Sequence, residues 1–248
     1  MTLYQKLAQH YDSLFPVSDK KISWIQKALE LRKSDKVLDL GCGTGSYVVS
    51  FAERGHEAYG IDSDYGMIDK AIKTIEKRNL NKAHVAVGDI LEQYPFESTY
   101  NGIMCIGNTL PHLQSVDEVA NSLELAKNHL SDDGVLIIQT VNYDLNGIEN
   151  KTFPTLTAKE GRVRFNRHYS PKSEIKVNFH TELEIDQANC DNNDTEVYHS
   201  TIELLCLRKH NLEKILLDLD FRNIDFYCGF TDKLWDYDGS GTVAIAKK

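Results

Sequence analysis

The nine residues from Val37 to Gly45, VLDLGCGTG, constrain this chain more than any other stretch. The first half is apolar, as in a buried strand, and the second half contains Gly41, Gly43 and Gly45. Because glycine has no side chain, the backbone of such a turn can approach a bound molecule closely, beside the start of the next helix. The stretch therefore predicts the strand, turn and helix of a nucleotide-binding fold.

The glycine spacing and the acidic residue before it distinguish between ligands. The pattern is G-x-G-x-G, not the G-x-G-x-x-G of dinucleotide-binding turns, and Asp39 stands two residues before the first glycine. A dinucleotide presents pyrophosphate here, which a carboxylate repels, whereas the methionine part of S-adenosylmethionine presents an ammonium that a carboxylate neutralises. The pattern favours S-adenosylmethionine, with Asp39 either binding that ammonium or bonding neighbouring backbone amides.

Length and composition limit the class of protein. With 248 residues, of which 41% are apolar, we expect one domain with an insertion. The net charge of -9 argues against a nucleic-acid partner, because such partners require a basic face. No signal peptide or bilayer-spanning run is evident, so we expect a cytoplasmic protein without a membrane partner. Scattered cysteines and histidines predict reduced thiols and no metal; the cysteines are Cys42, Cys105, Cys190, Cys206 and Cys228.

Apolar strands alternate with helical patterns from residue 36 to residue 141. Strands are expected at residues 36–40, 57–61, 83–87, 101–106 and 134–141. Helices are expected at residues 44–54, 65–77 and 117–130, the last behind a capping box of Ser115 and Glu118. This alternation predicts a parallel sheet with helices on both faces, and such sheets bind ligands at the carboxyl ends of their strands.

Residues 142–208 have a different pattern. Between residues 175 and 185 most odd positions are apolar and the even ones polar, which predicts a strand with one buried face. Strands are also expected at 162–169, before a Ser170-Pro171 turn, and at 196–207, after a polar loop at 189–195. We therefore expect an antiparallel insertion of two or three strands over the ligand end of the sheet.

The two ends of the chain complete the predicted fold. Residues 1–32 carry two helical patterns separated by Pro16, and residues 212–219 carry another. Strands at 222–228 and 242–246, joined without a helix, favour an antiparallel hairpin. The predicted fold class is α/β, a Rossmann-like, seven-stranded, mostly parallel sheet with this C-terminal hairpin. Three parts are expected: a helical cap at 1–33, a sheet domain at 34–141 and 209–248, and the insertion at 142–208.

Four motifs, VLDLGCGTG, GIDSD, VGDI and IMCIGNTLPHL, resemble in sequence and order those of class I S-adenosylmethionine-dependent methyltransferases. The likeness covers residues 36–141 and extends more loosely through the terminal hairpin. Within that family, GNTLPHL and the antiparallel insertion are similar to small-molecule enzymes of the glycine and sarcosine N-methyltransferase type. The resemblance implies methyl transfer from S-adenosylmethionine to a small polar acceptor, an amine or a carboxylate, with S-adenosylhomocysteine as the second product.

The same motifs indicate the cofactor residues. Asp62 closes the second strand, where its carboxylate is expected to bind both ribose hydroxyls; a helix N-cap is the alternative. The resemblance implies that Asp89 faces the adenine amino group, with Ile90 and Met67 on either side of the ring, although Met67 also fits core packing. The complete predicted cofactor set is Tyr11, Asp39, Gly41, Cys42, Gly43, Thr44, Gly45, Asp62, Ser63, Met67, Asp89, Ile90, Ile106 and Gly107.

Asn108, His112 and Tyr11 are the predicted catalytic residues. The amide of Asn108 is expected to orient the acceptor, and His112 either accepts a proton or is an ordinary solvated loop histidine. Tyr11 is expected to bond the cofactor carboxylate or touch the methyl group, unless it packs on its apolar stripe. Arg167 and Tyr169 of the insertion are the predicted substrate residues, because an arginine fork matches a carboxylate, unless the insertion's arginines line a solvent face.

Two other functions stay open from the sequence. Methylation of RNA or protein would need an extended basic or peptide-binding groove, which the acidic composition does not indicate. A partner subunit that binds the cofactor without turnover would carry the same cofactor motifs, since binding and catalysis use different residues. The oligomeric state is open between monomer and homodimer.

Overall fold

The computed structural model describes residues 3–186 and 195–248 of the chain. Packing divides the chain into two compact units, each described here by itself. The smaller unit comprises residues 1–16 and 147–206, and the larger unit comprises residues 17–146 and 207–248. The three-part domain division expected from the sequence stays a prediction. The boundary between the two units falls after Pro16, because the helix that follows Pro16 packs into the core of the larger unit.

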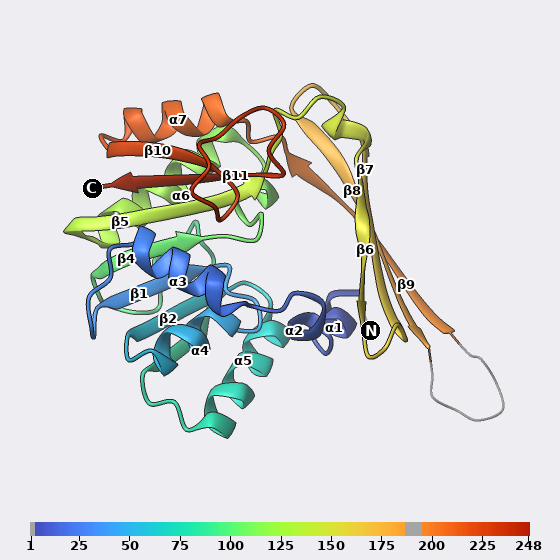
Figure 1. Cartoon of the computed structure of the whole chain (residues 1–248), viewed down its shortest axis with the longest axis horizontal. Helices are drawn as coiled ribbons and strands as arrows, with labels where there is room; N and C mark the ends of the chain where they lie inside the picture. The colour runs from blue at the N-terminus through green and yellow to red at the C-terminus, as the bar shows by residue number, and fades with distance from the viewer. Residues whose placement is uncertain (1–2, 187–194) are drawn as a thin grey trace. The chain divides into compact units, whose positions relative to one another are not determined.

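A seven-stranded sheet forms the centre of the larger unit, as Figure 1 shows. In spatial order its strands are β10 (Arg222–Cys228), β11 (Gly241–Lys247), β5 (Leu130–Val141), β4 (Tyr100–Cys105), β1 (Lys36–Leu40), β2 (Glu57–Asp62) and β3 (Ala83–Val87). Strands β1 to β5 pair in parallel, and β11 pairs antiparallel with both β5 and β10. The predicted Rossmann-like sheet and its terminal hairpin are confirmed.

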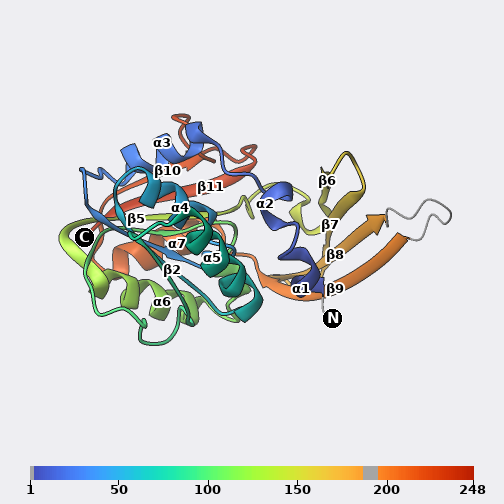
Figure 2. The same cartoon turned by 90° about the horizontal axis from the view of Figure 1, so that it is seen from below.

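Helices cover both faces of this sheet (Figure 2). The helices on one face are α3 (Asp19–Ala28), α4 (Ser46–Glu53) and α5 (Tyr65–Arg78), and those on the other are α6 (Val116–His129) and α7 (Lys209–Asp218). Ile22, Phe51 and Ile68 of the first group join the strands in one buried core. The hydroxyl of Ser115 accepts a hydrogen bond from the backbone N–H of Glu118, which caps α6 at the predicted position.

Element ends differ from the predicted ones by up to four residues. β5 begins at Leu130 and α6 ends at His129, and the early part of β5 pairs with β4 through a register shift between Tyr100 and Gly102. α7 begins at Lys209, earlier than the expected residue 212. Apolar periodicity carries little information at element ends, where few side chains are buried. No helix among residues 3–186 and 195–248 is long and apolar enough to cross a membrane.

The smaller unit is an antiparallel four-stranded sheet with two short helices on one face. Its strands, in order, are β6 (Thr152–Ala158), β7 (Val163–Pro171), β8 (Lys176–Asp186) and β9 (Thr195–Leu205), and its helices are α1 (Leu3–Leu7) and α2 (Tyr11–Leu14). Leu3, Leu7 and Leu14 pack with Val163, Phe165 and Leu183 of the sheet. The first helical pattern of the sequence is thus two short helices, not one.

The number of strands in the insertion differs from the expected two or three. Sequence reasoning missed β6 because Pro154 lies within it and a register shift between Phe153 and Leu156 breaks the period of two. The predicted Ser170-Pro171 turn is also wrong, since both residues continue β7. The predicted polar loop at 189–195 lies, apart from Thr195, outside the described residues.

The predicted buried face of β8 is found only in part, because Phe179 and Ile185 are half-buried. Val177 and Leu183 are buried, as the odd-numbered pattern requires. Ile175 is 60% exposed, because it precedes the strand instead of lying in it.

Candidate active site

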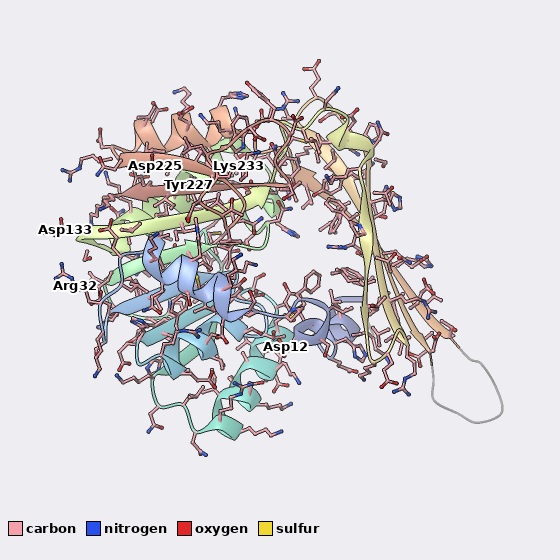
Figure 3. All side chains as sticks on the ribbon, viewed as in Figure 1. Asp12, Arg32, Asp133, Asp225, Tyr227 and Lys233 are labelled. Carbon is pink, nitrogen blue, oxygen red and sulfur yellow. The ribbon has the colours of Figure 1, made fainter. Side chains whose placement is uncertain are left out.

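Most of the predicted cofactor residues lie at the carboxyl ends of β1, β2, β3 and β4. Figure 3 shows which edge this is: Arg32 and Asp133 lie near the opposite, amino edge of the sheet, whereas Lys233 follows β10 on the carboxyl side. Backbone hydrogen bonds tie the loops of this edge together, because the N–H groups of Gly41 and Cys42 both donate to the carbonyl of Ile61, at 2.8 and 2.9 Å. The turn after β1 is therefore joined to the carboxyl end of β2.

The turn after β1 needs glycine at the predicted positions. Gly41, Gly43 and Gly45 have φ values of 77°, 55° and 73°, in the left-handed region that favours glycine. A Cβ atom on Gly41 would lie 2.5 Å from Cγ2 of Thr109, in the loop after β4. Such a contact is too short to form, so the absence of a side chain at residue 41 lets two loops of the site pack together.

Asp39, at the buried end of β1, has an unsatisfied carboxylate oxygen. The side chain is 1% exposed, and among the described residues its Oδ1 has no hydrogen-bond partner. Burial raises the pKa of Asp39 to about 8, with a further contribution from the negative charge of Asp62. A cationic ligand would supply the missing partner, so this carboxyl fits the ammonium of S-adenosylmethionine.

Asp62 holds the glycine turn and is not the cap of the next helix. Its Oδ2 accepts a hydrogen bond from the N–H of Gly43 at 2.8 Å, and its Oδ1 accepts one from the N–H of Asp64 at 2.9 Å. The N-cap of α5 is Asp64, which accepts from the N–H of Met67 at 2.9 Å. Each oxygen of Asp62 has a second lone pair, so the carboxylate remains able to accept from two hydroxyl groups.

The other predicted cofactor residues form two groups by exposure. Asp89 is exposed and its Oδ1 accepts a hydrogen bond from the N–H of Leu91, and Ser63 is exposed after β2. The buried residues are Cys42, Thr44, Met67, Ile90 and Ile106. Buried apolar side chains next to exposed carboxylates suit a ligand with a flat apolar ring and polar edges.

The loop after β4 is held in an unusual backbone conformation. Gly107 and Asn108 have φ values of 78° and 68°. The N–H of Gly107 donates to Oε1 of Gln139 at 2.8 Å, and Oδ1 of Asn108 accepts from the N–H of Val141 at 2.9 Å. Nδ2 of Asn108 donates to the hydroxyl of Tyr143 at 3.0 Å. Strained backbone of this kind persists only where neighbours fix it, and Gln139 and Tyr143 are those neighbours.

Sequence reasoning missed Gln139, Asn142 and Tyr143, which lie in and just after the last parallel strand. Nδ2 of Asn142 donates to the carbonyls of Asp236, Tyr237 and Gly239, at 3.4, 3.0 and 2.9 Å. Asn142 is 1% exposed and so fixes the loop between β10 and β11 from below the surface. Polar residues at a strand's carboxyl end are the one signal that points to them in the sequence.

His112 ends a short 3-10 helix, η1 (Leu110–His112), and the residue as a whole is exposed. Neighbouring protein nevertheless removes part of the water around its ring, and this desolvation lowers the pKa of His112 below its usual value. The imidazole is therefore neutral at pH 7 and is able to accept a proton.

The remaining predicted residues, Tyr11, Arg167 and Tyr169, belong to the smaller unit. The ring of Tyr11 lies 4.8 Å from that of Phe15, and Tyr169 is buried. Because these residues and those above lie in different units, their common role toward one ligand stays a prediction.

Arg167 has an aromatic environment within the smaller unit. Its guanidinium carbon lies 5.8, 5.4 and 5.7 Å from the ring centres of Phe15, Phe153 and Phe165. Nη2 donates to the carbonyl of Pro154 at 2.9 Å, but Nε is buried without a partner among the described residues. Burial lowers the pKa of Arg167. A guanidinium with an unused donor in such surroundings is suited to an anion.

Comparisons with known proteins agree with this geometry. Residues 37–134 match a family model described as a methyltransferase domain. The chain is 23% identical over 225 residues to the glycine/sarcosine N-methyltransferase of Aphanothece halophytica, covering 90% of this chain and 79% of that protein. It is also 23% identical over 250 residues to the glycine/sarcosine N-methyltransferase of Halorhodospira halochloris, covering 97% of this chain and 89% of that protein. An S-adenosylmethionine-dependent methyltransferase of Clostridium acetobutylicum ATCC 824 has the same fold, with a TM-score of 0.80, 20% identity and 98% coverage of both chains.

The matched domain contains the glycine turn, the unsatisfied Asp39 carboxyl, Asp62 and the loop after β4. The chain is a class I S-adenosylmethionine-dependent methyltransferase, and S-adenosylmethionine is its cofactor. Asp39, the glycine turn and Asp62 would hold the cofactor in the larger unit. No cluster of three or more His, Cys, Asp or Glu side chains suited to a metal occurs in the part of the chain that the structure describes.

Proposed function

We propose that this enzyme methylates the amine of a small acceptor that also carries a carboxylate, and that Arg167 binds that carboxylate. The environment of Arg167 is the observation that carries the proposal. Two relatives of the chain are glycine/sarcosine N-methyltransferases, which supports a small amino acid as the acceptor. The proposal is narrower than the methyltransferase activity itself, and it makes a separate claim about the acceptor.

The surroundings of Arg167 favour a carboxylate over other groups. Aromatic rings attract the guanidinium through their faces but accept no strong hydrogen bond from its donors. Among the described residues, the carbonyl of Pro154 accepts a hydrogen bond from Nη2 of Arg167, and the buried Nε has no partner. A carboxylate accepts two parallel N–H bonds from a guanidinium, so a small anionic acceptor would satisfy Nε and a second donor at once.

The residues of the chain have limited chemistry to perform in this reaction. Bound S-adenosylmethionine supplies a methyl group carried on a sulfonium. The acceptor nitrogen must offer a lone pair, so an ammonium form of the acceptor has to lose a proton first. We assign that proton to His112, because its lowered pKa keeps the ring neutral at pH 7. Positioning of the acceptor supplies most of the remaining rate, on the order of 7 to 11 kcal/mol for well-oriented reactants.

A panel of four acceptors tests separately whether the amine and the carboxylate are each required. Purified enzyme is incubated with S-adenosylmethionine and glycine, sarcosine, methylamine or acetate, and S-adenosylhomocysteine is measured. Glycine or sarcosine should be methylated, whereas methylamine lacks the carboxylate and acetate lacks the amine. Methylamine turned over as efficiently as the amino acids would contradict the proposal.

Variants of the two arginines test the residue assignment. Arg167→Met should raise the KM for the amino acid about 10- to 150-fold, the value of a charge-assisted hydrogen bond, and leave S-adenosylhomocysteine binding unchanged. Arg167→Lys should restore part of the loss. Arg162→Met is the matched control, because Arg162 is an exposed arginine of the same unit. If both Met variants raise the KM for the amino acid equally, Arg167 is not the residue that binds the acceptor carboxylate.

The other candidate functions give different products in one further experiment. Enzyme with labelled cofactor is mixed with a total cell extract. Label in small molecules supports the proposal, label in RNA or protein replaces it with macromolecule methylation, and tight cofactor binding without transfer replaces it with a partner-subunit role.

A further inference from the structure

Lys21 lies next to the glycine turn of the larger unit, and none of the roles above uses it. It is in the first turn of α3 and is partly buried. Its Nζ lies 4.4 Å from the ring centre of Phe230 and 5.4 Å from that of Tyr47. Tyr47 is the second residue of α4, the helix that directly follows the glycine turn. Lys21 therefore lies at the edge of the sheet that carries the predicted cofactor residues.

The ammonium of Lys21 has no anionic partner in the described part of the chain. It forms neither an ion pair nor a side-chain hydrogen bond with a carboxylate there, unlike Lys6, Lys73 and Lys209. Ring faces attract a cation but leave its N–H donors unused. Loss of water lowers the pKa of Lys21, and the charge of Asp39 acts on it in the opposite direction. A partly dehydrated ammonium without an acceptor is a site for an anion.

Lys21 and Asp39 together form a complementary pair. Asp39, before the turn, has a buried oxygen without a partner among the described residues. Lys21, which contacts Tyr47 in the first turn of α4, has donors without an acidic partner in residues 3–186 and 195–248. The methionine tail of the cofactor carries one ammonium and one carboxylate. We propose that Lys21 binds the carboxylate of this tail, while Asp39 binds its ammonium.

The structure holds Lys21 and Phe230 in place before any ligand binds. Ser18 caps α3 by accepting from the N–H of Lys21 at 3.3 Å. Nε1 of Trp24, one turn along α3, donates to Oδ1 of Asp232 at 3.0 Å, and the Trp24 ring lies 5.6 Å from that of Phe230. Because the helix and the loop after β10 are already joined, ordering Lys21 on binding costs little conformational entropy.

Three ligands that differ only in the amino-acid tail test this assignment by calorimetry. S-adenosylhomocysteine has both charged groups, its decarboxylated analogue has only the ammonium, and 5′-methylthioadenosine has neither. Lys21→Met should weaken S-adenosylhomocysteine about 10- to 150-fold and change the other two ligands less than about twofold, because only one ligand carries the carboxylate. Lys21→Arg should restore most of the affinity. Lys20→Met is the matched control, since Lys20 is the exposed neighbour on the same helix.

Two outcomes would overturn the proposal. If Lys21→Met weakens all three ligands equally, Lys21 has a structural role in the turn, and a lowered melting temperature would accompany it. If the variant leaves all three affinities unchanged, Lys21 does not bind the cofactor tail. Both readouts are measured without an acceptor, so they do not depend on the proposed substrate class.

Discussion

Cofactor binding should tighten as the pH rises from 6 to 7.5, because Asp39 must lose a proton to bind an ammonium. Burial raises the pKa of this carboxyl to about 8 in the cofactor-free protein. At pH 7 roughly nine in ten molecules then carry a protonated Asp39, and each further unit of acidity lowers the ionised fraction about tenfold, or about 1.4 kcal/mol of binding free energy. The dissociation constant should therefore fall nearly tenfold per pH unit over this range.

The assay is titration calorimetry with S-adenosylhomocysteine in buffers of different ionisation enthalpy. At pH 7 binding should release about 0.9 proton to the buffer, the fraction of Asp39 that is protonated. The range stops at pH 7.5 because an α-amino group itself loses its proton near pH 8. 5′-Methylthioadenosine, which has no ammonium, should bind independently of pH, and Asp39→Asn should abolish the proton release.

A dissociation constant that stays flat between pH 6 and 7.5, with no proton released, would refute this reasoning. It would mean that the Asp39 carboxyl is already ionised in the free protein, or that the ligand ammonium binds elsewhere. Retention of the pH dependence in Asp39→Asn would assign it to another group.

The proton on Asp39 also makes the stability of the cofactor-free protein depend on pH. The direction of that dependence follows from the raised pKa of Asp39. The folded protein holds a proton on Asp39 up to about pH 8, whereas the unfolded chain releases it near the usual value of 3.8. The unfolded state thus binds fewer protons between these values, so the free energy of unfolding should decrease as the pH rises through that window. Asp39→Asn should remove this loss, which urea titrations at pH 5 and pH 8 measure.

Three further substitutions give separate expectations. Asp62→Ala should weaken S-adenosylhomocysteine by about 1 to 3 kcal/mol in calorimetry, and unchanged affinity would contradict ribose binding. Gly41→Ala should destabilise the protein by on the order of 1 to 3 kcal/mol in urea titrations, because its Cβ meets Thr109; Thr109→Ala should relieve part of that cost, and simple additivity would refute the contact. Asn142→Ala should speed amide hydrogen exchange across residues 229–240, and unaltered protection there would show that other contacts hold the loop.

The strand, glycine turn and helix at the start of the cofactor edge were predictable from the sequence because their pattern is local. The glycine turn and Asp39 occupy seven consecutive residues, and their spacing indicates a strand that ends in a turn, with a carboxylate just before it. The parallel sheet followed from the alternation of strands and helices, and its terminal hairpin followed from a connection without a helical pattern. These inferences need no knowledge of which distant side chains meet.

The residues that were missed depend on contacts between distant segments. Asn142 bonds carbonyls more than ninety positions away, and Lys21 meets Phe230 across most of the chain. β6 was missed for a different reason, since Pro154 and a register shift remove the alternation that marks a strand. Packing decides such features, and a single sequence contains no direct record of it.

The hydrogen bonds of Asn142 have a consequence for how this enzyme tolerates change. Its amide recognises three main-chain carbonyls of the β10–β11 connection and none of that segment's side chains. Leu234 and Tyr237 on the segment are each 68% exposed. Substitutions of these two exposed side chains leave the hydrogen bonds of Asn142 intact, so the surface chemistry of the segment is able to change without a change in its backbone path.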